Sequence, residues 1–181
     1  MKKSLLILLP LYVVAGLFVP AKAQAQTTQV EIRFDYVKQK GIGSNQFAVW
    51  IEDARGQYVK TLYSTRFTAT GGYKRRAQAI PTWVRQSNLA AMEKAQVDAI
   101  TSPTPQSGSL RYNWDGTDSE GRALGEGEYR VLVEGTLRLD NRVLYTATIK
   151  LGERGQTAAQ PQYFGSGTRE RGMIGAVTVT Y

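Results

Sequence analysis

The chain has 181 residues, enough for one domain with a substantial hydrophobic core, and its formal net charge is +8. It contains no cysteine and no histidine. This excludes a disulfide scaffold, a Cys nucleophile, a Ser-His-Asp triad, and zinc or haem held through Cys or His. Redox chemistry in this protein therefore requires a borrowed cofactor.

The N-terminal segment has the order of a secretory signal peptide. Lys2 and Lys3 form a basic start, a mostly apolar run covers 5–19, and small-x-small sites end at Ala23 and Ala25. The apolar run is too short for a comfortable membrane span. We therefore expect export to the periplasm and cleavage of the signal peptide.

The expected signal peptide covers 1–23, with 25 as the alternative end, and one Ig-like domain covers 24–181. Cleavage after residue 23 removes three lysines, so the net charge falls from +8 to +5. An exported protein rarely meets nucleic acid, so the modest positive charge indicates anionic surfaces, small anions or solubility. We expect no nucleic-acid partner, and the sequence predicts no particular oligomeric state.

Short strands separated by turn signals dominate the mature chain. Alternation of apolar and polar residues predicts strands at 30–36, 47–51, 58–63, a segment ending at Trp114, 129–133, 143–151 and 173–181. Turn residues follow the first two strands, at Gly41–Asn45 and Asp53–Gly56. About seven strands at this spacing predict an all-β fold, an Ig-like antiparallel β-sandwich. The stretch 153–172, rich in Gly, Gln and charge, is predicted to be a loop.

An insertion at about 67–108 interrupts the strand pattern. It contains the basic cluster Lys74-Arg75-Arg76 and a predicted helix from Asn88 to Val97, capped by Ser87 or Asn88. A long insertion on a rigid β scaffold is a common location of function, so we expect the functional site here.

Two segments carry a resemblance to a known module. Val49–Asp53 with Gly56 and Val59–Leu62 resemble the first half of the Ig-like repeat of flagellar hook-capping proteins. Trp114–Arg122 with Gly127–Tyr129 resemble its second half. With Gly71–Arg76 and the Pro-x-Trp at 81–83, the mature chain resembles a family of predicted periplasmic proteins of unknown function that shares this core. The resemblance implies an Ig-like fold and no particular activity, because a fold does not fix a function.

A second resemblance concerns the end of the insertion. Asp98-Ala99-Ile100-Thr101-Ser102-Pro103-Thr104 resembles the flavinylation motif of exported redox carriers, with Pro103 where Ala is usual. The resemblance implies that a periplasmic flavin transferase attaches FMN covalently to Thr104. Asp98, Thr101 and Ser102 are the other motif residues that match. A membrane reductase, in a system such as iron handling, is the implied redox partner.

These observations favour an exported, non-enzymatic accessory protein, a flavinylated electron carrier, without catalytic residues or a metal site. The alternative is a cofactor-free Ig-like binding or assembly module, in which the Thr104 stretch is an ordinary loop. The 74–76 cluster with Arg85 is either an anion site or a solvated face. Asp115, Asp118 and Glu120 fit a β-turn better than a calcium loop. The three tryptophans are expected in the core or against the insertion: Trp50, Trp83 and Trp114.

Export predicts a specific N-terminus. The protein isolated from the cell envelope should begin at Gln24 or Gln26, because cleavage is expected after Ala23 or Ala25. The intact mass measured by mass spectrometry checks this directly. Recovery of envelope protein that retains Met1 would contradict cleavage.

Overall fold

The computed structural model describes residues 29–40, 44–138, 140–165 and 172–181. The predicted signal peptide and residues 41–43 of the first predicted turn lie outside the described residues. The strands are β1 (Val30–Tyr36), β2 (Gln46–Asp53), β3 (Tyr58–Thr65), β4 (Thr101–Ser102), β5 (Gly108–Trp114), β6 (Gly127–Arg138), β7 (Asn141–Leu151), β8 (Gln156–Ala158), β9 (Gln160–Phe164) and β10 (Thr178–Thr180). The helices are α1 (Arg66–Ala69), α2 (Pro81–Gln86) and α3 (Lys94–Ile100), with short 3-10 turns η1 (Gly72–Lys74) and η2 (Leu89–Ala91).

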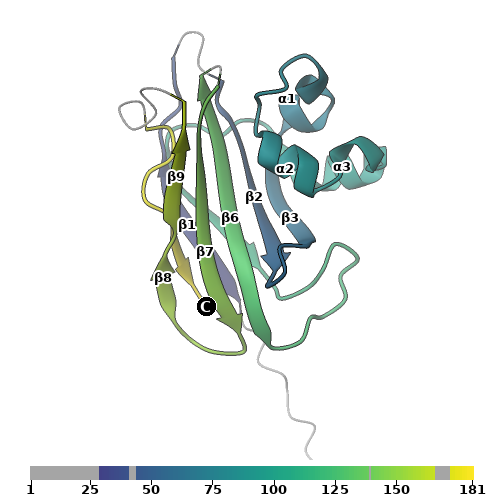
Figure 1. The fold of residues 1–181 in the computed structure, drawn as a ribbon, viewed down its shortest axis with the longest axis vertical. Coiled ribbons are helices and arrows are strands. Elements are labelled where there is room, and N and C mark those ends of the chain that lie inside the picture. Colours follow the sequence, from purple (N-terminus) through teal and green to yellow (C-terminus); the bar gives the residue numbers. More distant parts are fainter. Residues whose placement is uncertain (1–28, 41–43, 139, 166–171) are drawn as a thin grey trace, which may run out of the picture.

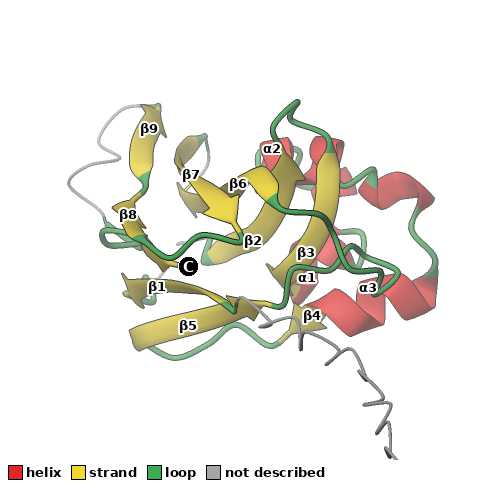
Figure 2. Cartoon of the chain, turned by 90° about the horizontal axis from the view of Figure 1, so that it is seen from below, coloured by secondary structure: helices red, strands yellow, loops and turns green. Residues whose placement is uncertain are grey.

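Two sheets pack face to face. The smaller has the order β5-β1-β10-β8, and the larger has the order β4-β3-β2-β6-β7-β9. The described pairings are antiparallel except that of β3 with β4, which is parallel. Figure 2 shows β1 and β5 as a layer beneath β2, β3 and β6. The predicted all-β sandwich with an inserted helical segment is confirmed.

The inner core lies between the two sheets and follows the predicted alternation. In β1 the side chains of Val30, Ile32, Phe34 and Tyr36 are buried, whereas Arg33 between them is exposed. Strand β7 repeats the pattern, with its odd-numbered residues from 143 to 151 turned inward. One-sided burial of this kind fixes the register, because a shift by one residue would expose the whole apolar face.

Strand β2 differs because its residues are buried along almost its whole length, from Gln46 to Glu52. Phe47, Val49 and Ile51 belong to the inner core. The alternate residues face a second group of buried side chains on the opposite face of the larger sheet, here called the outer cluster: Ala48, Trp50, Ala69, Ile80, Trp83, Leu89 and Leu132. The central part of the larger sheet is therefore covered on both faces.

The helical insertion between β3 and β4 supplies the cover. Figure 1 shows α1, α2 and α3 gathered beside β3 at one side of the molecule. Trp83 of α2 is fully buried against Trp50 and Leu132 in the outer cluster. All three tryptophans are fully buried, as expected from the sequence.

The predicted helix from Asn88 to Val97 is wrong in its bounds. Asn88 has a left-handed φ of 50°, η2 ends at Ala91, and α3 begins only at Lys94. Glu93 starts α3 through a capping box. The Glu93 side chain accepts a hydrogen bond from the backbone N–H of Gln96, and the Gln96 side chain accepts one from the backbone N–H of Glu93. This reciprocal pair favours a helix start at that point, and it divides the predicted helix in two.

The predicted loop at 153–172 contains two strands in its described part. Strand β8 pairs with β10, and β9 pairs with β7. Their side chains are mostly exposed, so no apolar alternation marks them, and their backbone hydrogen bonds extend the sheet edges. The final strand is shorter than predicted, although Met173, Val177 and Val179 are buried as expected.

The inner core predicts a large effect of Trp114→Ala. Trp114 is fully buried, lies 5.2 Å from the Tyr129 ring, and donates from Nε1 to the carbonyl of Thr117 at 2.8 Å. We expect its removal to lower the free energy of unfolding by about 3–5 kcal/mol in urea denaturation. Val37→Ala, at a side chain 51% exposed, should change it by less than about 0.5 kcal/mol. Equal stability of the two variants would show that the core lies elsewhere.

Candidate functional site

A buried carboxylate fixes the insertion to the larger sheet. Glu134 lies on β6, is fully buried, and accepts hydrogen bonds from the backbone N–H groups of Trp83 at 2.9 Å and Thr82 at 3.3 Å. These N–H groups belong to the first turn of α2 and have no partner within the helix. Arg142 of β7 donates to the same carboxylate at 2.9 Å. Burial raises the pKa of Glu134, while these hydrogen bonds and the guanidinium act in the opposite direction.

Further polar contacts attach the insertion at other points. Thr136 accepts from the Ile80 N–H at 2.8 Å and donates to the Gln78 carbonyl at 3.0 Å. The Trp83 indole donates to Thr61 Oγ1 at 2.9 Å. These side chains are buried on the sheet, and their bonds have defined directions, so the helices are fixed in position as well as covered.

A cleft of about 740 Å³ remains between β3 and the helices η2 and α3. Its apolar and aromatic lining consists of Tyr58, Leu62, Ala91, Met92, Ala95, Ala99 and Ile100. Its uncharged polar lining includes Thr61, Ser87, Asn88, Gln96, Asn113 and Ser119. Apolar walls with a few convergent polar groups, at this volume, are typical of small-molecule sites.

Ser87 and Lys60 are two polar residues of the cleft wall. The Ser87 hydroxyl is buried, with Ser87 only 5% exposed, and makes no hydrogen bond within the described part of the chain. Such a group normally has a partner, because burying it without one is costly. Lys60 lines the same cleft and donates to Thr117 Oγ1 at 2.5 Å and to Asp115 at 3.1 Å.

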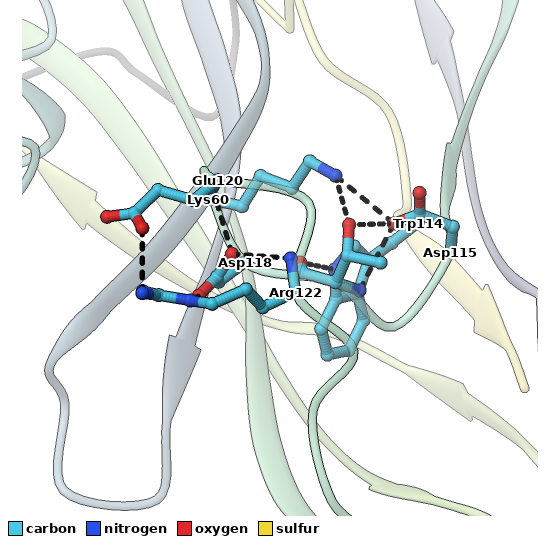
Figure 3. Close-up of polar contacts among 7 residues, drawn as sticks. Lys60, Trp114, Asp115, Asp118, Glu120 and Arg122 are labelled. Carbon is cyan, nitrogen blue, oxygen red and sulfur yellow. Dashed lines mark hydrogen bonds and ion pairs between the residues drawn. The ribbon is translucent and has the colours of Figure 1, made fainter.

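The turn at 115–122 contacts Lys60 and is stabilised by carboxylates of the turn itself (Figure 3). Asp118 accepts from the backbone N–H groups of Glu120 and Arg122 and pairs with the Arg122 guanidinium at 2.7 Å. This pairing lowers the pKa of Asp118, and the Thr117 hydroxyl lowers the pKa of Asp115. The turn interpretation of these acidic residues is confirmed.

The flavinylation-like stretch follows directly from the cleft wall. Asp98 lies in α3 with its carboxylate paired to Lys94 at 2.5 Å. Thr101 and Ser102 form β4 and pair with Ser64 and Thr65 of β3 at the sheet edge.

Thr104 lies after β4 in an irregular segment that leads to β5. It is half-buried, and its hydroxyl makes no hydrogen bond to the residues that the structure describes. The carbonyl of the preceding Pro103 accepts from the Tyr63 hydroxyl at 3.2 Å, which ties the segment to β3. The Asp98 carboxylate accepts a hydrogen bond from Lys94. The four motif residues are therefore close in sequence, but they do not form one hydrogen-bonded cluster in the described structure.

The basic cluster lies against aromatic rings of the insertion. The guanidinium carbons of Arg75 and Arg76 are 5.5 and 5.9 Å from the Phe67 ring centroid, and the Lys74 ammonium is 5.9 Å from that of Tyr73. Phe67 belongs to α1, and α1 contacts β4. The cluster is thus attached to the element next to the Thr104 segment.

Sequence reasoning missed the residues that build the cleft and anchor the insertion: Lys60, Ser87, Asn113, Glu134 and Thr136. One signal for an anchor was present, because Glu134 interrupts an otherwise apolar run in β6. The cleft residues carry no such signal, since they lie far apart in the chain and share a wall only after folding.

The fold and the site define a β-sandwich protein whose larger sheet carries an inserted helical layer with a cleft beneath it. Residues 27–167 match the family described as "Predicted periplasmic protein (DUF2271)", and the chain belongs to this family. The predicted periplasmic localisation is thereby confirmed. Searches of curated proteins and of solved structures found no match. No helix in the described ranges has the length and apolar character needed to cross a membrane.

The anchor role of Glu134 predicts a large effect of Glu134→Ala. The variant leaves two helix N–H groups and the Arg142 guanidinium without their acceptor, so the free energy of unfolding should fall by about 3 kcal/mol. Glu153→Ala is the matched control, because Glu153 pairs with Lys150 at 3.4 Å on the surface and should cost less than about 1 kcal/mol. Urea denaturation measures both, and an unchanged midpoint for Glu134→Ala would disprove the anchor.

Proposed function

We propose that this protein is a non-enzymatic periplasmic electron carrier with FMN attached covalently to Thr104. The observation that carries the proposal is the state of Thr104, a half-buried residue that stands between Pro103 and Pro105 and whose hydroxyl makes no hydrogen bond within the described residues. Irregular backbone at the surface of a rigid scaffold is accessible to a modifying enzyme. The absence of His and Cys leaves the chain dependent on a bound group for redox chemistry.

The attachment reaction requires only a hydroxyl group from this protein. The Thr104 hydroxyl oxygen attacks the phosphorus on the FMN side of the FAD pyrophosphate, and the bond to the AMP phosphate breaks. AMP leaves, a phosphoester forms at Thr104, and the hydroxyl proton passes to a base of the transferase. This chain contributes the positioned hydroxyl, and the periplasmic flavin transferase contributes FAD and the catalytic groups.

The residues near Thr104 fit an anionic phosphoester. The insertion has five basic and no acidic residues between positions 66 and 92. Arg66 directly follows Thr65, which pairs with Ser102 of β4, and the basic cluster at 74–76 is attached through Phe67 of α1. Positive charge in this region stabilises a bound phosphate.

Once bound, the flavin supplies reversible electron transfer, and the chain supplies position and solvent exclusion. A membrane reductase is the proposed partner, with iron handling as one such system. The β-sandwich carries the group on a rigid body, so the partner meets one surface rather than a flexible tail.

Co-expression with a periplasmic flavin transferase tests the proposal. The wild-type protein should show flavin fluorescence in a denaturing gel and an FMN mass adduct, and Thr104→Val should show neither. Thr148→Val is the matched control, because Thr148 is an exposed threonine on β7. The Thr148→Val variant should keep the FMN adduct. Circular dichroism should confirm that both variants remain folded. Absence of the adduct from wild type, or its persistence in Thr104→Val, would refute the site.

A second candidate is a cofactor-free binding or assembly module of the cell envelope. The part of the insertion at 66–92, which has basic but no acidic residues, favours it, because such a stretch attracts anionic partners without any cofactor. The same experiment separates the two functions, since this candidate predicts no adduct on the folded wild-type protein.

A further inference from the structure

The cleft between β3 and the insertion has features that the attachment of FMN at Thr104 does not by itself explain. It combines a volume of about 740 Å³, apolar walls with several polar groups, and a wall that ends four residues before Thr104. We infer that this cleft binds the isoalloxazine ring of the FMN attached at Thr104. The inference rests on the proposed function and adds the place where the ring lies.

The position of the cleft suits a tethered ligand. Ile100 lines it, and the chain from Ile100 to Thr104 spans at most about 14 Å. The phosphate and the ribityl chain of FMN form a flexible tether of similar reach. A tether keeps the local concentration of the ring high, so even weak contacts hold it in the cleft.

The shape of the wall suits a flat ring. Ala91, Ala95 and Ala99 recur every four residues along η2 and α3, and all three line the cleft. Their small side chains let a planar group approach the helix backbone closely. Leu62 and Met92 add apolar surface for the dimethylbenzene part of the ring.

The polar groups suit the opposite end of the ring. The pyrimidine part of isoalloxazine has two carbonyl acceptors and one N–H donor, and it carries no positive charge. Lys60 is the charged side chain among the described lining residues, and two of its three amine protons are used by Thr117 and Asp115. The amides of Asn88 and Asn113 supply both donors and acceptors.

The charge of the lining limits the class of ligand that the cleft can bind. A cationic ligand is disfavoured, because Lys60 faces the cleft and no carboxylate lines it.

The test uses the flavinylated full-length protein from co-expression. Iodide quenching of flavin fluorescence measures how much of the ring is exposed to solvent. Sites of this type bury most of their ligand, so the quenching constant should be about three- to tenfold lower than for free FMN. A wild-type protein with an FMN adduct but with quenching equal to free FMN would overturn the inference and leave the proposed function intact.

Variants that fill the cleft give the matched comparison. The double variant Ala95→Leu with Ala99→Leu should keep its FMN mass adduct, while its iodide quenching constant rises toward that of free FMN. The control is Ala77→Leu with Ala90→Leu, at two exposed alanines outside the lining, and its quenching should equal wild type. The single variant Ala99→Leu adds less bulk to the cleft and should also raise the quenching constant. Unchanged quenching in both cleft variants would overturn ring binding, and absence of any adduct on wild type would refute the proposed function itself.

Discussion

The apolar outer face of β2 and β6 is the constraint on which the rest of the structure depends. Trp50 and Leu132 lie on this face and are fully or almost fully buried, although the smaller sheet covers only the opposite side. A face of this kind exposed to water would lose the free energy that burial supplies. The insertion is therefore a structural layer, and Glu134 gives it a fixed position on the sheet.

The position of the insertion also determines where the cleft forms. Because α2 is fixed over the centre of the larger sheet, η2 and α3 extend past β3, and the cleft forms beneath them. The chain returns to the sheet as β4, parallel to β3, and then reaches Thr104. Thr104, the proposed attachment residue, and the cleft thus lie along one chain path around a single sheet edge. This continuity is the physical reason to treat them as one site.

Local sequence pattern predicted the parts of the fold in which one face is buried. The alternation in β1 and β7 identified both strands and their inward residues. The sequence pattern did not reveal β8 and β9, since most of their side chains are exposed and no apolar alternation marks them. It also did not reveal the helix boundary that the Glu93 capping box sets. Thr104 could be proposed from the sequence because the stretch that resembles the flavinylation motif is contiguous. The cleft was not, because Lys60 and Ser87 meet only when the insertion folds over β3.

Hydrogen exchange at the Trp83 backbone amide tests the central claim, that the insertion is fixed to the sheet, most directly. This N–H donates to the Glu134 carboxylate at 2.9 Å, so its protection reports the contact between insertion and sheet. If the insertion is an integral layer, the amide should open with a free energy close to that of the β6 amides in the same protein. Exchange near the rate of an unprotected peptide, with β6 still protected, would show that the layer detaches and would contradict the account.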